Sequence, residues 1–193
     1  MPFDQAKMWH AIEARLAATE NSRHRQMLEV VVEHAKAEAD RSVERLMATL
    51  VDDPQYHFWV RARDVGPKGR DRVHDYYVTF ATSGGAVFES PKDRIVVDDH
   101  NVVTEAEVKN YVPGTIAKAR GYDVPDESGH YLVRFRNVVF FEFGDDPTRA
   151  LGEDSYTQMD PDAWERVAEA DLPKSYVDYL AELRSTQWAQ PTR

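Results

Sequence analysis

The spacing of apolar residues divides the chain into a helical first third and a longer part with strand periodicity. Apolar residues recur every three or four positions across residues 5–20 and again across residues 28–50, which predicts two helical segments. Asp53 and Pro54 follow this region and are expected to end it, because proline cannot continue a helix. A short aromatic strand is predicted next, over residues 56–60.

One more helix separates that strand from the rest of the chain. Gly84 and Gly85 provide its expected end, since glycine readily adopts the backbone that closes a helix. Residues 70–82 carry four bulky side chains at helical spacing on one face, namely Val73, Tyr76, Tyr77 and Phe80. The segment is therefore predicted to be a helix with one aromatic face.

From Ala86 onward the apolar positions alternate with polar ones, which is the period of strands. The predicted strands, separated by polar turns, cover residues 87–89, 94–97, 102–112, 131–143 and 150–158. The tail is predicted to return to helix over residues 161–185. This helix would begin in "DPDAWERVAEA", capped by Asp160 or Asp162, and continue through "SYVDYLAELR".

The strand over residues 131–143 changes character at Asn137. Before it, Arg134 and Arg136 alternate with apolar residues, whereas after it only Glu142 interrupts an apolar run. A strand that is apolar on both faces is covered on both faces. We therefore expect its concave side to line a cavity and its convex side to be covered by a second subunit, with Asn137 either facing the cavity or forming a bulge.

Helices followed by a meandering sheet predict the α+β class, with a curved antiparallel sheet packed on N-terminal helices. A length of 193 residues suits one domain. We expect residues 1–193 to form it, with a core at about residues 28–159 and helical additions at residues 5–20 and 161–185.

Charge and composition exclude several classes of function. The formal net charge is −10 with no basic block, which disfavours nucleic acid and anionic membranes as partners. The chain has no cysteine, so disulfides and thiolate chemistry are absent. No signal-peptide pattern or membrane-length apolar run is present, and a cytoplasmic protein is expected.

The order of these elements resembles the nuclear transport factor 2-like superfamily, specifically its SnoaL-like branch. The resemblance covers roughly residues 28–159 and is carried by four segments: "MATLVDDPQYHF", "GRDRVHDYYVTF", "NVVTEAEVKNYVPGT" and "VVFFEFGDDPTRALGEDSY". It implies a cone-shaped α+β barrel, commonly a homodimer, with a pocket at its open end. Relatives include polyketide cyclases, ketosteroid isomerase, scytalone dehydratase and limonene epoxide hydrolase.

Enzymes of this superfamily perform acid–base chemistry without a metal or an organic cofactor, so the resemblance implies neither. A carboxyl or imidazole in an apolar cavity has its pKa moved toward neutrality, which suits proton transfer. The candidate catalytic residues are His57, Glu105 and Asp154. Glu105 shares strand parity with charged neighbours typical of a solvated face. His57 also fits a strand edge or a hydrogen-bonded position in the core, and Asp154 also fits an exposed edge. SnoaL-like cyclases use an aspartate late on the final strand, where this sequence has Thr157 and Gln158.

Ligand contacts are expected from the aromatic helix and the last two strands. The candidates are Tyr76, Tyr77, Phe80, Asn137, Phe141 and Tyr156, and the two helical tyrosines also fit core positions. The acidic segment at residues 98–100 is interpreted as a turn, and no metal site is predicted. Two functions remain open: a cofactor-independent lyase, isomerase, cyclase or hydrolase acting on a small apolar ring compound, or a non-catalytic ligand-binding or dimerisation module.

Overall fold

Three helices make up the first third of the chain in the computed structural model, which describes residues 3–60 and 62–188. They are α1 (Lys7–Ala17), α2 (Ser22–Ala39) and α3 (Val43–Ala48). The helical segment expected over residues 28–50 is thus interrupted between α2 and α3. At the break Arg41 has a φ of 56°, in the left-handed region that a right-handed helix cannot pass through. Ser42 then caps α3, its hydroxyl accepting from the N–H of Arg45.

The described strands form one curved sheet in the order β2-β1-β7-β6-β5-β3, with β4 also paired to β5. Their bounds are β1 (His57–Val60), β2 (Arg63–Asp64), β3 (Val87–Glu89), β4 (Lys92–Val97), β5 (Asn101–Pro113), β6 (His130–Phe143) and β7 (Ala150–Val167). Neighbouring strands are antiparallel except β1 and β7, which run parallel. The sheet is not closed, because β2 and β3 lie at its two ends.

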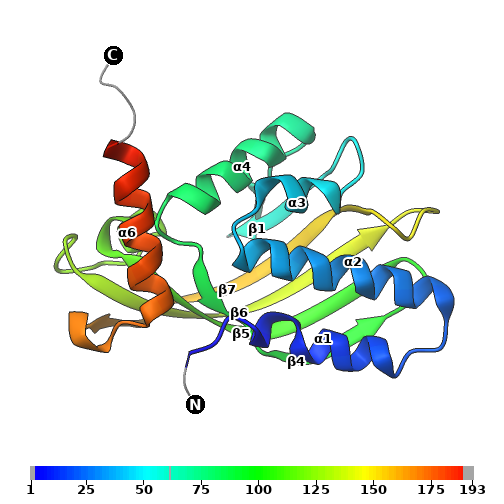
Figure 1. Cartoon of the computed structure of the whole chain (residues 1–193), viewed down its shortest axis with the longest axis horizontal. Coiled ribbons are helices and arrows are strands. Elements are labelled where there is room, and N and C mark those ends of the chain that lie inside the picture. The colour runs from blue at the N-terminus through cyan, green and yellow to red at the C-terminus, as the bar shows by residue number, and fades with distance from the viewer. Residues whose placement is uncertain (1–2, 61, 189–193) are drawn as a thin grey trace.

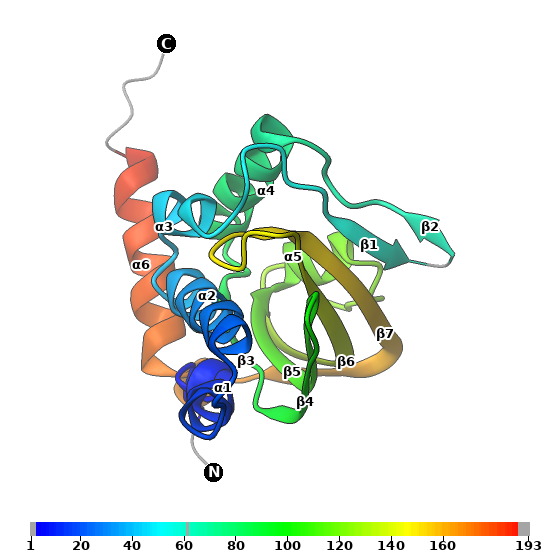
Figure 2. The same cartoon turned by 90° about the vertical axis from the view of Figure 1, so that its right-hand side faces the viewer.

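Helices cover the concave side of this sheet, which confirms the predicted α+β class. Figure 1 shows α2 and α3 lying across the sheet, with α4 (Arg70–Thr82) beyond them. Figure 2 shows the sheet curling from β4 and β5 through β6 and β7 to β1, with the first helices on its inner side. The C-terminal helix α6 (Lys174–Trp188) stands beside β3. Among the described residues, no helix is both long and apolar enough to cross a membrane.

The last strand is longer than its sequence pattern suggests. A helix was predicted over "DPDAWERVAEA", but β7 runs to Val167 and only a short 3-10 turn, Glu169–Asp171, precedes α6. The expected cap at Asp160 or Asp162 is therefore wrong. The physical reason is the partner strand: the N-terminal end of β6 needs backbone hydrogen bonds, and residues 164–167 of β7 supply them after a register shift. Helix α5 (Gly114–Ala119) and β2 had no sequence prediction.

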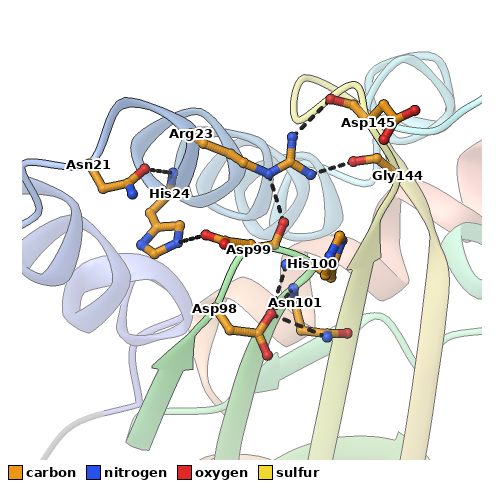
Figure 3. A network of polar contacts seen from close by, with 9 residues as sticks. All are labelled: Asn21, Arg23, His24, Asp98, Asp99, His100, Asn101, Gly144 and Asp145. Atoms are coloured by element: carbon orange, nitrogen blue, oxygen red, sulfur yellow. Dashed lines mark hydrogen bonds and ion pairs between the residues drawn. The ribbon is translucent and has the colours of Figure 1, made fainter.

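Both ends of α2 are fastened to other parts of the molecule. Near its start, Arg23 donates from Nε to the carbonyl of Asp99 at 2.7 Å and from Nη1 to the carbonyl of Asp145 at 2.8 Å, and it also bonds the carbonyl of Gly144. His24 Nε2 lies 2.9 Å from a carboxylate oxygen of Asp99 (Figure 3). These contacts tie α2 to the β4–β5 and β6–β7 turns.

Beyond the other end of α2, Arg41 bonds Glu182 of α6 at 2.9 Å and stacks on the ring of Tyr179, its guanidinium carbon 4.7 Å from the ring centroid. The helix is thus held across the sheet from both sides. Side chains on its inner face are positioned accordingly.

Candidate active site in the concave face

A cavity of about 440 Å³ lies between the helices and the concave face of the sheet. Much of its wall is apolar and comes from Phe58, Tyr76, Phe80, Phe88, Ala106, Val108, Phe135, Val139 and Phe141. The polar side chains in the wall include Glu38, Ser90, Lys92, Thr104, Asn110, Arg120, Asn137, Glu153, Ser155 and Thr157. A cavity that combines an apolar wall with convergent polar groups is the usual form of a small-molecule site.

Strand alternation decides which residues reach this cavity. On β5 the even-numbered residues from Thr104 to Asn110 face inward, so Glu105 faces outward. On β7 the inward residues are Glu153, Ser155 and Thr157. The inward residues of β5 and β7 are therefore the immediate neighbours of Glu105 and Asp154, the two carboxyl groups that the sequence analysis selected.

Two ionisable groups of the cavity titrate near neutral pH. Burial raises the pKa of Glu38 to about 7, with Glu153 adding to the rise and His34 and Lys92 opposing it. Burial lowers the pKa of Lys92 to about 8, against the attraction of the same two carboxyl groups. Lys92 also donates to the hydroxyl of Ser90 at 2.9 Å. The cavity thus holds a carboxyl group and an amine that can each gain or lose a proton near neutrality.

The hydrogen bonds around His34 fix one of its two ring protons. The Thr49 hydroxyl donates to the carbonyl of Leu46 at 2.6 Å, so its oxygen accepts from Nδ1 of His34 at 2.7 Å. Nε2 of the same ring lies 3.0 Å from Oε1 of Glu153 and 2.8 Å from the hydroxyl of Tyr77. A protonated ring donates from Nε2 to Glu153, whereas a neutral ring accepts from Tyr77.

The balance of these contacts favours the protonated ring. Burial acts to lower the pKa of His34, but the hydrogen bond and the charge of Glu153 outweigh it, and the pKa is raised. Glu38 and Glu33 add further attraction for the cation. His34 and Glu153 together therefore form a pair that can hold a proton beside Glu38.

Asn137 supplies a further polar group on the floor of the cavity. Its Oδ1 accepts from the hydroxyls of Ser155 at 3.0 Å and Thr157 at 3.2 Å. With the carbonyl oxygen satisfied, the amide N–H groups make no hydrogen bond with other described residues and remain for a ligand. Asn137 thus lies in the cavity wall, which is one of the two positions expected for it.

Four of the six ligand-binding candidates line the cavity: Tyr76, Phe80, Asn137 and Phe141. Tyr77 is fully buried behind the wall, where its hydroxyl meets that of Tyr56 at 2.6 Å as well as His34. Tyr156 is 47% exposed on the opposite face of the sheet and packs against Phe140. Tyr77 can therefore act on a ligand only through its neighbours.

The structure places the three catalytic candidates on the outer face. His57 Nδ1 lies 2.8 Å from a carboxylate oxygen of Asp64, and Glu105 accepts from Arg136 at 2.5 Å. Asp154 is opposite His57 in the register of β7 with β1. Their side chains point away from the part of the cavity wall that Phe58, Thr104, Ala106, Glu153 and Ser155 form.

Sequence reasoning missed five ionisable groups that belong to the cavity region: His34, Glu38, Lys92, Arg120 and Glu153. A signal existed for two of them, because His34 and Glu38 are spaced i, i+4 within the apolar stripe of α2. A charged residue on an apolar helix face is unusual. Among the described residues, no group of three or more His, Cys, Asp or Glu side chains is arranged to hold a metal ion.

Comparison with solved structures identifies the fold. A NTF2-like protein from Anabaena variabilis superposes with a TM-score of 0.54 at 14% identity, over 74% of this chain and 96% of that one. A protein assigned as a SnoaL-like polyketide cyclase from Shewanella putrefaciens gives 0.55 at 10% identity, over 91% and 94%. A SnoaL-like polyketide cyclase from Agrobacterium tumefaciens gives 0.50 at 14% identity, over 68% and 91%.

The chain therefore has the NTF2-like fold of SnoaL-like polyketide cyclases, as its sequence resemblance predicted. No protein-family model matches the sequence. No curated protein matches it either. At these identities the likeness shows the fold alone, and chemistry has to be argued from the cavity.

Proposed function

We propose that the cavity binds a small, largely apolar ring compound and transfers a proton on it without a metal or an organic cofactor. The observation that carries this proposal is the presence of Glu38 and Lys92, with pKa values of about 7 and 8, in a mostly apolar cavity of about 440 Å³. Proton transfer is most efficient when the pKa of the catalytic group lies near the working pH. Isomerisation, cyclisation, dehydration and hydrolysis all use such a step.

Glu38 is the proposed general base, because its pKa lies at about 7. The positive charge of Lys92 stabilises the ionised form of Glu38. The same charge would stabilise the negative charge that develops on a substrate oxygen. We further propose that the His34–Glu153 pair stores a proton that can pass to or from Glu38. The hydroxyl of Tyr77 would fix the orientation of the His34 ring. Asn137 would orient the ligand through its amide N–H groups.

A fluorescence and thermal-shift screen of steroids, terpenoids and aromatic polyketides tests the binding part of the proposal. A ligand should stabilise the fold by about 2.7 kcal/mol at a hundredfold excess over its dissociation constant. Asn137→Leu should keep the fold but change which compounds bind, because the few polar groups of a pocket set orientation. If no compound raises the melting temperature, the binding proposal fails.

Turnover of a compound found in that screen tests the catalytic part. Glu38→Gln should lower kcat by at least about 100-fold, the usual contribution of a general base. In the unmutated protein, kcat should rise with pH through about 7 as Glu38 ionises. Unchanged turnover by the Glu38→Gln variant would leave a ligand-binding module as the better description.

The second candidate, a non-catalytic dimerisation module, is favoured by the outer face of the sheet. Phe140 and Tyr156 pack together there, and the ring of Trp59 stacks on Tyr156 with 6.3 Å between centroids. Nearly half of Tyr156 is exposed. We propose that a second copy covers this face, since aromatic side chains on an open sheet are typical of an interface between subunits.

Light scattering at micromolar concentration tests this assembly. Phe140→Glu should give a monomer, because it would bury an unpaired charge between the two sheets. The exposed Val96→Glu on β4 is a matched control that introduces the same charge elsewhere. A monomeric unmutated protein would contradict the proposed homodimer.

A further inference from the structure

Arg120 is a cationic residue of the cavity wall and forms the C-cap of α5. It is the last residue before Gly121, whose φ of 90° closes the helix. The N–H of Gly121 donates to the carbonyl of Lys118 at 2.9 Å, and the N–H of Tyr122 donates to that of Ala117 at 3.2 Å. This is the Schellman pattern of a helix end. The backbone of Arg120 is therefore held in one conformation. The residue is exposed as a whole, and it contributes to the cavity wall.

The guanidinium group is held in place by a buried amide. Nη1 of Arg120 donates to Oδ1 of Asn110. Nδ2 of Asn110 donates to the carbonyls of Gly85 at 3.0 Å and Val87 at 2.9 Å, which fixes the orientation of the amide. A Cβ at Gly85 would lie 3.1 Å from Nη2 of Arg120, so the absence of a side chain there leaves this part of the guanidinium uncrowded.

No carboxylate of a described residue balances the charge of Arg120. Among the described residues the guanidinium forms no ion pair, and its one hydrogen bond is the contact with neutral Asn110. Lys92, the other cation of the wall, is attracted by both Glu38 and Glu153. Burial lowers the pKa of Arg120, with only Tyr76 and Tyr122 opposing this, yet a guanidinium stays protonated at neutral pH.

The guanidinium N–H groups of Arg120 that are not used by Asn110 match an oxyanion in geometry, and hydrogen bonds to an ionised acceptor are stronger than those to a neutral one. We propose that Arg120 binds an oxyanion carried by the ligand, so that the substrate of this cavity is an apolar ring compound with one carboxylate or phosphate group. This inference rests on the proposed function, because it assigns one more recognition element to the same cavity. The two carboxyl groups, Glu38 and Glu153, would repel the same oxyanion, which orients the ligand with its anionic group at Arg120.

Fluorescence titration with anthracene-2-carboxylate and anthracene-2-carboxamide tests the proposal, since the two probes differ mainly in charge. The unmutated protein should bind the carboxylate at least about tenfold more tightly than the amide, as expected for a charge-assisted hydrogen bond. Arg120→Gln should remove this preference while keeping a donor for Asn110. Arg120→Lys should retain part of it.

Lys118→Gln provides the control, because it removes one positive charge from the same helix at an exposed residue paired with Glu127. It should keep the full preference. Melting temperatures of the three variants establish that each is folded. Displacement of the bound probe by naphthalene-2-carboxylate and by 2-naphthyl phosphate then identifies which oxyanion the site prefers.

The outcomes separate this inference from the proposed function. Equal binding of the two probes by the unmutated protein, or an undiminished preference in Arg120→Gln, overturns the oxyanion site while the ligand cavity stands. If neither probe binds and the apolar screen is also negative, the proposed ligand cavity is overturned and the oxyanion site with it. A preference that is lost in Arg120→Gln and kept in Lys118→Gln supports the assignment.

Discussion

Replacing Glu38 by Gln should make the protein more stable at neutral and alkaline pH, although Glu38 is the proposed catalytic base. The pKa of this carboxyl rises from an ordinary 4.5 to about 7 on folding. Between these values the folded protein keeps a proton that the unfolded chain has lost. Because the folded state binds more protons there, its free energy of unfolding falls as the pH rises.

The size of the effect follows from the shift. A rise from 4.5 to about 7 corresponds to about 3 kcal/mol of lost stability once the pH exceeds 7. Glutamine resembles the protonated acid and carries no such loss. The attraction of His34 and Lys92 is already included in this value, because both act to lower the pKa of Glu38. We therefore expect Glu38→Gln to match the unmutated protein at about pH 4 and to exceed it by about 1–3 kcal/mol at about pH 8.

Urea unfolding at several pH values between about 4 and 8 measures this difference. Glu29→Gln, which removes an exposed carboxyl from the same helix, is the control for the loss of one negative charge. A Glu38→Gln variant that is less stable than the unmutated protein at about pH 8 would refute the reasoning. So would a constant difference between the two proteins across the range, because the carboxyl would then not titrate differently on folding.

Further predictions concern the backbone and the ends of α2. Gly152→Ala puts a Cβ 1.8 Å from the carbonyl oxygen of Gln55 and should lower the free energy of unfolding by ~3 kcal/mol or prevent folding. At Gly121 a Cβ would have nothing within 4 Å, so Gly121→Ala should lower it by only about 1 kcal/mol, because of the positive φ. Equal losses in urea unfolding would contradict this contrast. Arg23→Met removes hydrogen bonds to three backbone carbonyls and should cost about 1–3 kcal/mol, against less than about 0.5 kcal/mol for the exposed Arg15→Met. Chemical denaturation that finds the two arginine variants equally stable would show that the turns do not depend on α2.

The sequence predicted the α+β class and most of the strands, because apolar residues recur at clear helix and strand spacings. It could not predict which side chains of each strand face the cavity. Alternation says that neighbouring side chains point to opposite faces, not which face is inside. On β7 both sets contain polar residues, so Asp154 was as plausible as the adjacent Glu153, and the structure places Glu153 inward. His57 lies outward beside the inward Phe58, and Glu105 is likewise on the outer face. The choice is made by packing against α2, which is tertiary information.

For α2 the sequence does indicate which face is inside, because a stripe of apolar residues defines its buried face. His34 and Glu38 lie within that stripe, and ionisable groups in such positions lower stability unless they are fully paired. Glu38 is only partly compensated, since its pKa remains raised despite His34 and Lys92. A deficit of about 3 kcal/mol is a large fraction of the stability of a typical domain. A residue retained only for packing would be better served by a neutral side chain at this position, so the raised pKa of Glu38 favours a role in chemistry over a role in holding the fold together.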